Sequence, residues 1–229
     1  MASIVATTDE AVAGIADGST VLVGGFGRAG VPMDLINALV RQGATGLTLV
    51  SNNAGNGTAG LAALLQAGQV RKVICSFPRQ SDSYVFDRLY RAGKVELELV
   101  PQGNLAERIR AAGAGIGAFY SPTGVGTPLA EGKETRVFDG RTYLLEHPIK
   151  GDVALISAYK SDGLGNLVYR KTARNFGPIM ATAAATVIAQ VNEIVPIGAL
   201  DPEAVITPSI YVDRVVQAAA REPRAYGVR

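Results

Sequence analysis

Thr20-Val21-Leu22-Val23-Gly24-Gly25-Phe26-Gly27-Arg28-Ala29-Gly30-Val31-Pro32 is an apolar run followed by closely spaced glycines and a proline. The apolar run predicts a buried strand, and the proline marks the place where a helix would begin. The apolar residues that follow share one face of that helix: Leu35, Ile36, Leu39 and Val40. Gly43 is a natural C-terminal stop. Strand, glycine-rich turn and helix in this order predict the start of a βαβ unit.

The same alternation continues along the first half of the chain. Strand-like runs are each followed by a segment of helical periodicity, at 20–24 then 33–42, 47–51 then 58–67, 71–77 then 82–92, and 95–100 then 104–112. This rhythm predicts an α/β fold with a twisted, mostly parallel sheet flanked by helices. Asn104 and Glu107 resemble a capping box at the start of the last helix.

The second half has a different composition. Residues 114–150 are rich in glycine and turn-forming residues, with a predicted strand at Arg141–Glu146, and indicate a small flap or lobe. The expectations for the rest of the chain are strands at Val153–Tyr159 and 185–190, helices near 176–184 and 210–220, and a solvated tail at Arg221–Arg229. No linker is long enough to divide two independent domains, so residues 1–229 are expected to form one domain.

Composition limits the classes of function. The 229 residues are 48% hydrophobic and 18% charged, with a formal net charge of +2. Lysine and arginine are scattered, so no binding to nucleic acid is expected. The longest apolar stretches fall short of the roughly 18 residues of a membrane span, and Met1 to Thr8 lack the charged start of a signal peptide. A soluble, cytoplasmic protein is therefore expected.

A single cysteine and a single histidine make a metal site unexpected. Cys75 lies in the apolar run Val73-Ile74-Cys75-Ser76-Phe77, which predicts a core thiol and leaves a nucleophile as the alternative. His147 lies between Glu146 and Pro148 and is expected in a turn. One residue of each type cannot supply the usual His and Cys ligands of zinc.

The segment Gly25–Gly30 also spells the G-x-G-x-x-G pattern of dinucleotide-binding proteins. Such a site needs an acidic residue about 20 positions further on, at the end of the second strand, to bind the ribose hydroxyl groups. That strand ends in Asn52 and Asn53, and Pro32 places the helix after the last glycine. The six-residue pattern is therefore a weak indication of a nicotinamide or flavin site.

The longer stretch from Asp17 to Pro32 resembles the signature of family I coenzyme A transferases. It has an acidic residue with a glycine, an aliphatic trio, Gly-Gly-Phe, three free positions, and then Gly-x-Pro. Residues 51–55, 101–110 and 121–127 are also similar to A subunits of the succinyl-CoA:3-oxoacid transferases. Within that family, Cys75–Asp87 and Asn56-Gly57 resemble the members that act on 3-oxoadipate, whereas the run 171–178 is shared widely. The resemblance tapers after about Arg214.

The resemblance implies an enzyme of aromatic-compound catabolism that moves CoA from succinyl-CoA to a 3-oxoacid, with 3-oxoadipate as the favoured acceptor. In the family, a glutamate in a Glu-Asn-Gly motif attacks the acyl-CoA thioester and becomes a glutamyl-CoA intermediate. This sequence contains no such motif. A separate B subunit is therefore expected to supply the glutamate, and the CoA thioester is a substrate, so no permanently bound cofactor is expected.

By the same resemblance, Gln102 faces the reacting acyl group, and Asn52 and Asn53 lie at the CoA or acyl side of the cleft. All three follow predicted strands, and ligand sites of parallel sheets gather at the carboxyl ends of strands. The structural alternatives are a glutamine that satisfies a local turn and an Asx turn before Gly55.

The glycine-rich loop is expected to let the backbone approach CoA or the catalytic loop of the partner, with its phenylalanine as an apolar wall. Its residues are Gly24, Gly25, Phe26, Gly27, Arg28, Ala29 and Gly30. The alternative is a tight connection without a ligand. Arg79, just after a predicted strand, is expected to bind the distal carboxylate of 3-oxoadipate or succinate, unless it is an ordinary surface arginine.

Three other functions stay open on the sequence alone. The nearest is a transferase for acetoacetate or another 3-oxoacid. The second is a nucleotide-dependent oxidoreductase, and the third is a noncatalytic CoA-binding module. The sequence also leaves open whether the two kinds of subunit form an αβ pair or an α2β2 assembly.

Overall fold

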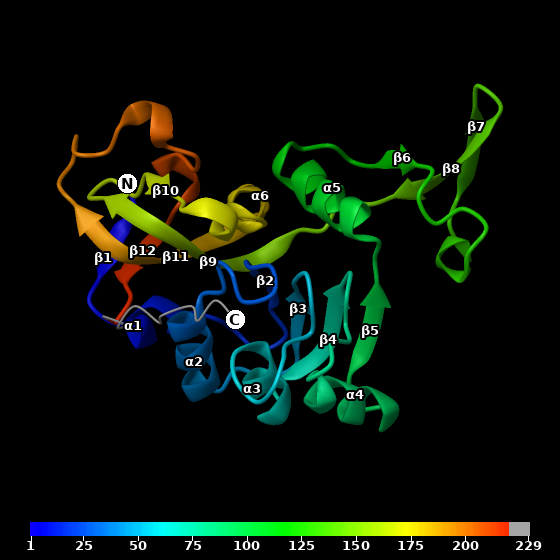
Figure 1. Cartoon of the computed structure of the whole chain (residues 1–229), viewed down its shortest axis with the longest axis horizontal. Coiled ribbons are helices and arrows are strands. Elements are labelled where there is room, and N and C mark those ends of the chain that lie inside the picture. Colours follow the sequence, from blue (N-terminus) through cyan, green and yellow to red (C-terminus); the bar gives the residue numbers. More distant parts are fainter. Residues whose placement is uncertain (220–229) are drawn as a thin grey trace, which may run out of the picture.

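The computed structural model describes residues 1–219, and the predicted tail at Arg221–Arg229 lies outside them. These residues form a nine-stranded sheet with helices on both faces and a separate three-stranded sheet at one end (Figure 1). The strand order of the large sheet is β1 (Ser3–Val5), β12 (Arg214–Gln217), β11 (Ala184–Val195), β9 (Gly151–Asp162), β2 (Thr20–Val23), β3 (Leu47–Val50), β4 (Val70–Cys75) and β5 (Glu96–Leu99). Every neighbouring pair in this order is parallel, and β10 (Leu167–Val168) runs antiparallel to β9. The predicted α/β fold with a mostly parallel sheet is confirmed.

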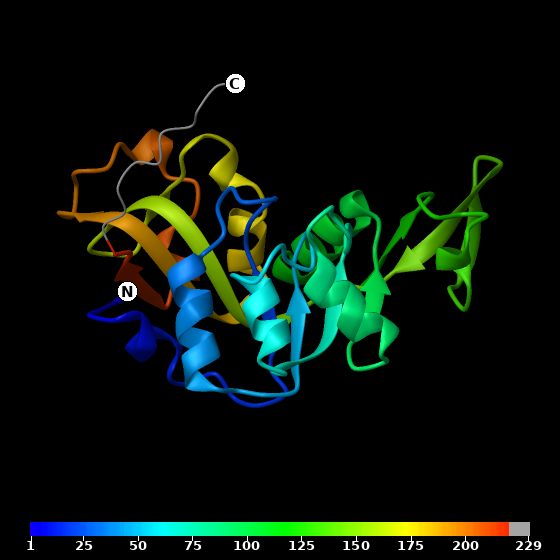
Figure 2. The ribbon, with the colours of Figure 1, turned by 60° about the horizontal axis from the view of Figure 1, so that its bottom comes forward.

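Helices cover both faces of the large sheet. One face packs against α1 (Thr8–Val12), α2 (Met33–Gln42), α3 (Leu61–Gln66) and α4 (Tyr84–Arg91), and the other against α5 (Gln102–Gly113) and α6 (Gly177–Thr182), as Figure 2 shows from a second direction. The strands alternate between these two cores: Val21 and Val23 pack toward α2, whereas Leu22 packs on the side of α6. Because both faces of the sheet are covered, a central strand such as β2 carries the continuous apolar run Val21–Val23, which is the pattern that predicted it.

Helix α2 has the bounds that its periodicity predicts, but its start depends on a distant residue. Gly43 ends the helix with φ of 87°, a left-handed conformation that glycine adopts at little cost. Pro32 offers no side-chain cap at the other end. Instead, Gln190 Oε1 of β11 accepts hydrogen bonds from the backbone N–H groups of Asp34 at 2.9 Å and Leu35 at 3.2 Å. A buried side chain from the sheet thus caps the helix.

Two expectations about helices are wrong. The predicted capping box fails because α5 begins at Gln102, and Asn104 Nδ2 donates to Glu146 Oε1 at 3.0 Å instead of capping the helix. No α-helix forms in the described part of 210–220, which holds the end of the short 3-10 helix η4 (Ser209–Tyr211) and then β12, which joins the sheet between β1 and β11. Both errors arose because contacts with distant residues override local propensity.

The predicted flap is present and forms the small sheet. Its strands are β6 (Phe119–Ser121), β7 (Thr135–Phe138) and β8 (Arg141–Glu146), paired antiparallel in the order β6-β8-β7, and they project beyond β5 (Figure 1). Glu146 is buried at the base of the flap, where it accepts from Asn104 Nδ2 and pairs with Lys133 Nζ at 2.6 Å. Ser121 Oγ donates to Asn104 Oδ1 at 2.8 Å. This polar cluster fastens the flap to α5.

The interior contains the single thiol. Cys75 is completely buried at the end of β4, and burial raises the pKa of its thiol to about 12. The expectation of a core thiol is therefore confirmed, since a nucleophilic cysteine would need a lowered pKa. Within residues 1–219, no helix is long and apolar enough to cross a membrane.

Candidate active site

The carboxyl ends of β2 and β9 mark the place where the connections of the sheet diverge. The chain leaving β2 passes through α2 on one face to reach β3, whereas the chain leaving β9 passes through α6 on the other face to reach β11. In open α/β sheets, a crevice forms where neighbouring strands diverge in this way, and ligands bind in it. Here the crevice lies between the loop Gly24–Gly30 and the short 3-10 helix η2 (Lys171–Arg174).

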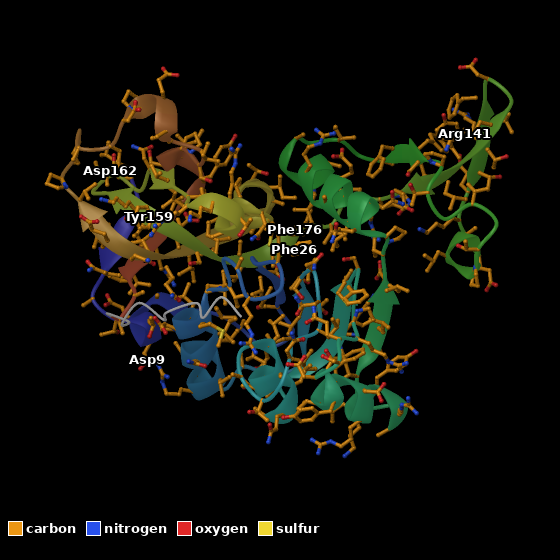
Figure 3. The ribbon with its side chains drawn as sticks, viewed as in Figure 1. Asp9, Phe26, Arg141, Tyr159, Asp162 and Phe176 are labelled. Carbon is orange, nitrogen blue, oxygen red and sulfur yellow. The ribbon has the colours of Figure 1, made fainter. Side chains whose placement is uncertain are left out.

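Two adjoining hollows occupy this crevice. The larger, of about 690 Å³, is lined by Phe26, Ala29, Thr172, Arg174 and Asn175. The smaller, of about 270 Å³, is lined by Phe26, Gln102, Gly103, Ala106, Asn175, Phe176 and Ile179. Phe26 and Asn175 line both, so the hollows form one cleft, and Figure 3 shows Phe26 and Phe176 close together between the loop and α6. The structure therefore brings Gln102 and the glycine-rich loop to one place, as the sequence predicts.

The glycine-rich loop is a tight, well-bonded turn. Phe26 and Ala29 exchange backbone hydrogen bonds of 2.9 and 3.0 Å across its neck. Gly30 has φ of 72°, and a Cβ atom there would lie 2.5 Å from the carbonyl oxygen of Ala173. Only glycine permits this approach of the loop to η2. Phe26 is 49% exposed, so its ring can serve as an apolar wall of the cleft.

Asn175 is a site residue that sequence reasoning missed. Its Oδ1 atom accepts from the backbone N–H groups of Gly25 at 3.1 Å and Phe176 at 2.7 Å. Its Nδ2 atom donates to the carbonyl oxygens of Ala29 at 3.0 Å and Thr172 at 2.7 Å. One side chain thus ties the loop after β2 to the segment before α6. The available signal was an asparagine just before the start of a predicted helix, which is typical of side chains that bond to the backbone.

Asn52 and Gln102 are in direct contact. Gln102 Nε2 donates to Asn52 Oδ1 at 2.8 Å, and Ser76 Oγ donates to the same oxygen at 2.9 Å. Asn52 is buried, whereas Gln102 is exposed at the first position of α5. The Gln102 amide makes no other hydrogen bond within residues 1–219, and this residue lines the smaller hollow.

Asn53 forms an Asx turn before Gly55, the alternative role that the sequence offers for it. Its Oδ1 atom accepts from the backbone N–H of Gly55 at 2.9 Å, and its carbonyl oxygen accepts from Ser51 Oγ at 2.5 Å. The side chain is buried and lines neither hollow. Asn53 therefore shapes the end of β3, and its contact with CoA stays a prediction.

The two arginines expected at the site lie outside the cleft lining. Arg79 Nη2 pairs with Asp87 Oδ1 of α4 at 2.7 Å, and Arg28 is part of the glycine-rich loop. Neither lines either hollow. A substrate carboxylate would have to compete with Asp87 for Arg79, so the role predicted for Arg79 stays a prediction without a supporting contact.

The start of α2 is poorly suited to bind a pyrophosphate. A dinucleotide fingerprint works because the first N–H groups of the following helix point at the phosphates. Here the N–H groups of Asp34 and Leu35 are already bonded to Gln190 Oε1. The G-x-G-x-x-G pattern is therefore present without the free helix N-terminus that a nicotinamide or flavin nucleotide requires.

Comparison with proteins of known sequence finds relatives that match this chain over most of its length. The chain is 71% identical over 206 residues to the A subunit of 3-oxoadipate CoA-transferase from Pseudomonas putida, covering 90% of this chain and 89% of the relative. It is 66% identical over 211 residues to the protein of the same name from Acinetobacter baylyi, with 92% of each chain covered. The A subunit of a probable succinyl-CoA:3-ketoacid coenzyme A transferase of Bacillus subtilis is 50% identical over 224 residues, covering 98% of this chain and 93% of the relative.

Two solved structures share the fold. A variant of the decarboxylase AibA/AibB is 30% identical, with a TM-score of 0.80 over 95% of this chain and 84% of that one. The acyl-CoA transferase YdiF of Escherichia coli O157:H7, in a thioester complex with CoA, has a TM-score of 0.84 at 24% identity, over 100% of this chain and 49% of that one. The second likeness shows the fold alone. Together with the match to the coenzyme A transferase family over residues 5–218, the relatives show that this chain belongs to that family.

Proposed function

We propose that this chain is the A subunit of a two-component enzyme that moves CoA from succinyl-CoA to 3-oxoadipate. The observation that carries the proposal is the 71% identity to the corresponding chain of 3-oxoadipate CoA-transferase from Pseudomonas putida, over most of both chains. The cleft at the carboxyl ends of β2 and β9 supports it, because Gln102 lies there beside the exposed ring of Phe26. A CoA thioester is thus a substrate, and the protein is proposed to act in the cytoplasm as one domain.

The cleft supports the proposal that the B subunit supplies the nucleophile. Within residues 1–219, no aspartate or glutamate lines either hollow. The family resemblance implies a glutamate of the B subunit that attacks succinyl-CoA, so that CoA thiolate leaves and an acyl-glutamyl anhydride forms. The thiolate then attacks the glutamyl carbonyl, which releases succinate and leaves glutamyl-CoA. The 3-oxoacid carboxylate takes the CoA by the same two steps in reverse.

Gln102 is proposed to act on the charge that develops during these steps. Each attack creates a negative oxygen on a tetrahedral carbon, and fixed N–H donors stabilise it more than they stabilise the carbonyl. The bond to Asn52 holds the Gln102 amide in place, and the side chain begins α5, whose N-terminus adds a positive dipole. The glycine-rich loop and the two asparagines are proposed to face the pantetheine of CoA.

Reconstitution tests the proposal. The chain is co-expressed with its candidate B subunit, and the complex is assayed with succinyl-CoA and a panel of 3-oxoacids. The expected result is ping-pong kinetics with a higher kcat/KM for 3-oxoadipate than for acetoacetate. Transfer by this chain alone would contradict the proposal that the B subunit supplies the nucleophile. A preference for acetoacetate would instead indicate a transferase for acetoacetate. Light scattering of the complex distinguishes αβ from α2β2.

A further inference from the structure

We propose that Arg174 binds the distal carboxylate of the acyl groups that the enzyme transfers, and that it thereby selects dicarboxylic acids. The inference rests on the proposed function, since succinyl and 3-oxoadipyl groups each keep one free carboxylate after they are joined to CoA. The sequence places this role on Arg79, whereas the arrangement of the cleft points to the arginine at the end of η2.

The position of Arg174 suits an acyl group held at Gln102. Gln102 lines the smaller hollow and Arg174 the larger, and Phe26 lies along both. An acyl group with its carbonyl at Gln102 would extend past Phe26 into the larger hollow. The exposed ring of Phe26 gives its methylene groups an apolar surface, and Arg174 lies on the wall that the distal end would reach.

Arg174 also carries a charge in the cleft that no described residue pairs with. Among the described residues that line the two hollows, it alone carries a charge. Its side chain makes no hydrogen bond or ion pair within residues 1–219. The adjacent Asn175 is fixed by four hydrogen bonds, so the backbone that presents Arg174 is held firmly. A guanidinium without a protein partner on a firm backbone suits a carboxylate, which it can bind through two parallel hydrogen bonds.

Tyr169, a titratable group that interacts electrostatically with Arg174, does not compete for this guanidinium. Burial raises the pKa of Tyr169 to about 12, and the Tyr169 hydroxyl is bonded to Thr207 Oγ1 at 2.9 Å. Tyr169 is therefore neutral near pH 7, when the substrate carboxylate is ionised. The phosphates of CoA are an alternative ligand for Arg174. They carry several negative charges, whereas the described residues that line this hollow include one cation, so the hollow suits a single carboxylate better.

Arg79 provides a matched comparison within the same chain. Its guanidinium is paired with Asp87 at 2.7 Å and lines neither hollow. Both arginines are exposed, so a neutral glutamine at either position removes one surface charge. The two substitutions differ in whether the lost charge faces the cleft or Asp87.

The test compares 3-oxoadipate with 3-oxohexanoate, in which a methyl group replaces the distal carboxylate. In ping-pong kinetics, kcat/KM for each acid reports its own half-reaction, so both are measured with the reconstituted complex. Arg174→Gln is expected to lower kcat/KM for 3-oxoadipate by about 10- to 100-fold, the range for a charge-assisted hydrogen bond. The value for 3-oxohexanoate should change less than about threefold. Arg174→Lys should lie between wild type and Arg174→Gln, and Arg79→Gln should resemble wild type.

Several results would overturn the assignment. Equal losses for the two acids would give Arg174 a structural role, and a selective loss in Arg79→Gln would return the role to Arg79. A loss for every CoA thioester, acetoacetyl-CoA included, with the free acids unaffected, would assign Arg174 to the CoA phosphates. If Arg174→Gln does not assemble, a loss of kcat/KM in Arg174→Lys that is larger for 3-oxoadipate than for 3-oxohexanoate supports the proposal, and unchanged kinetics contradict it. A wild-type complex without transfer to 3-oxoadipate would instead refute the proposed function itself.

Discussion

Asn52 Oδ1 accepts hydrogen bonds from Gln102 Nε2 at 2.8 Å and from Ser76 Oγ at 2.9 Å. A single oxygen thus joins the ends of β3, β4 and β5, because these three residues follow those strands. The bond fixes the orientation of the Gln102 amide before substrate arrives. A hydrogen-bond donor that is already oriented stabilises a transition state more than one that must reorganise. By orienting the amide of the exposed Gln102, the buried Asn52 therefore increases the stabilisation that this amide can provide.

Gln102→Ala is expected to lower kcat of the reconstituted complex by about 100-fold or more, with a smaller change in KM, because the donor acts mainly on the developing negative charge. Steady-state kinetics with succinyl-CoA and 3-oxoadipate measure this. Ala106→Gly, a small change on the same helix face, serves as the control for disturbed packing, since Ala106 lines the same hollow. A loss below about threefold in Gln102→Ala would remove Gln102 from the mechanism.

Asn52→Ala is expected to act through Gln102. It should lower kcat by roughly tenfold, because the glutamine amide loses the acceptor that orients it. The double variant Asn52→Ala/Gln102→Ala should then be no slower than Gln102→Ala alone, since residues that act as a unit are not additive. A double variant whose loss in kcat is the product of the two single losses would show that Asn52 affects kcat independently of Gln102, for example through the pantetheine that it is proposed to face.

Most of the large sheet was predictable because its signals are local. The run Val21–Val23 is apolar on both faces, and α2 carries its apolar stripe, its proline start and its glycine stop within a few residues. Parallel strands then place their carboxyl ends at one edge. This is why Asn52 and Gln102, 50 positions apart, could be expected together.

The errors involve residues whose partners lie far along the chain. Asn175 bonds to Gly25 across 150 positions, and Gln190 caps α2 across 156. Nothing near either residue in the sequence signals these contacts. Asn104 is a good capping residue by type, but the buried Glu146 offers its amide an acceptor 42 positions away. Contacts with distant residues therefore determine details of the site that local sequence patterns do not predict.

Gly30→Ala is expected to damage the cleft, and Gly27→Ala to be mild. Both glycines have positive φ, 72° and 58°. The new Cβ at Gly30 would lie 2.5 Å from the Ala173 carbonyl oxygen, whereas nothing lies within 4 Å of one at Gly27. We expect about 1 to 2 kcal/mol lost in unfolding free energy for Gly27→Ala, from left-handed backbone strain, and a larger loss with little activity for Gly30→Ala. Equal stability in urea unfolding would contradict the close approach.

Glu146→Gln is expected to loosen the flap. The buried carboxylate pairs with Lys133, which is partly exposed, so the local free energy of opening should fall by roughly 1 to 3 kcal/mol. Amide hydrogens of β8 would then exchange faster in hydrogen–deuterium exchange. Glu107→Gln is the control, because Glu107 pairs with Arg110 on the exposed side of α5. Equal exchange rates in β8 for wild type and Glu146→Gln would show that the ion pair does not fasten the flap.

Cys75 should make the protein sensitive to alkali. Burial raises the pKa of its thiol from 9.0 to about 12, so the folded chain keeps a proton that the unfolded chain loses. The stabilising contribution is fully present below about pH 9 and is lost as the pH rises toward 12. At pH 10 the loss from this thiol is on the order of 1 kcal/mol of unfolding free energy.

Cys75→Ala removes the titrating group, although the small cavity that it leaves lowers stability at every pH. Its unfolding free energy should therefore fall less between pH 8 and pH 10 than that of the wild type. Urea unfolding at the two values measures both chains, and Tyr169, whose pKa is raised by burial to about 12, titrates equally in each. Parallel losses in the two proteins would mean that the thiol ionises in the folded state as easily as in the unfolded chain.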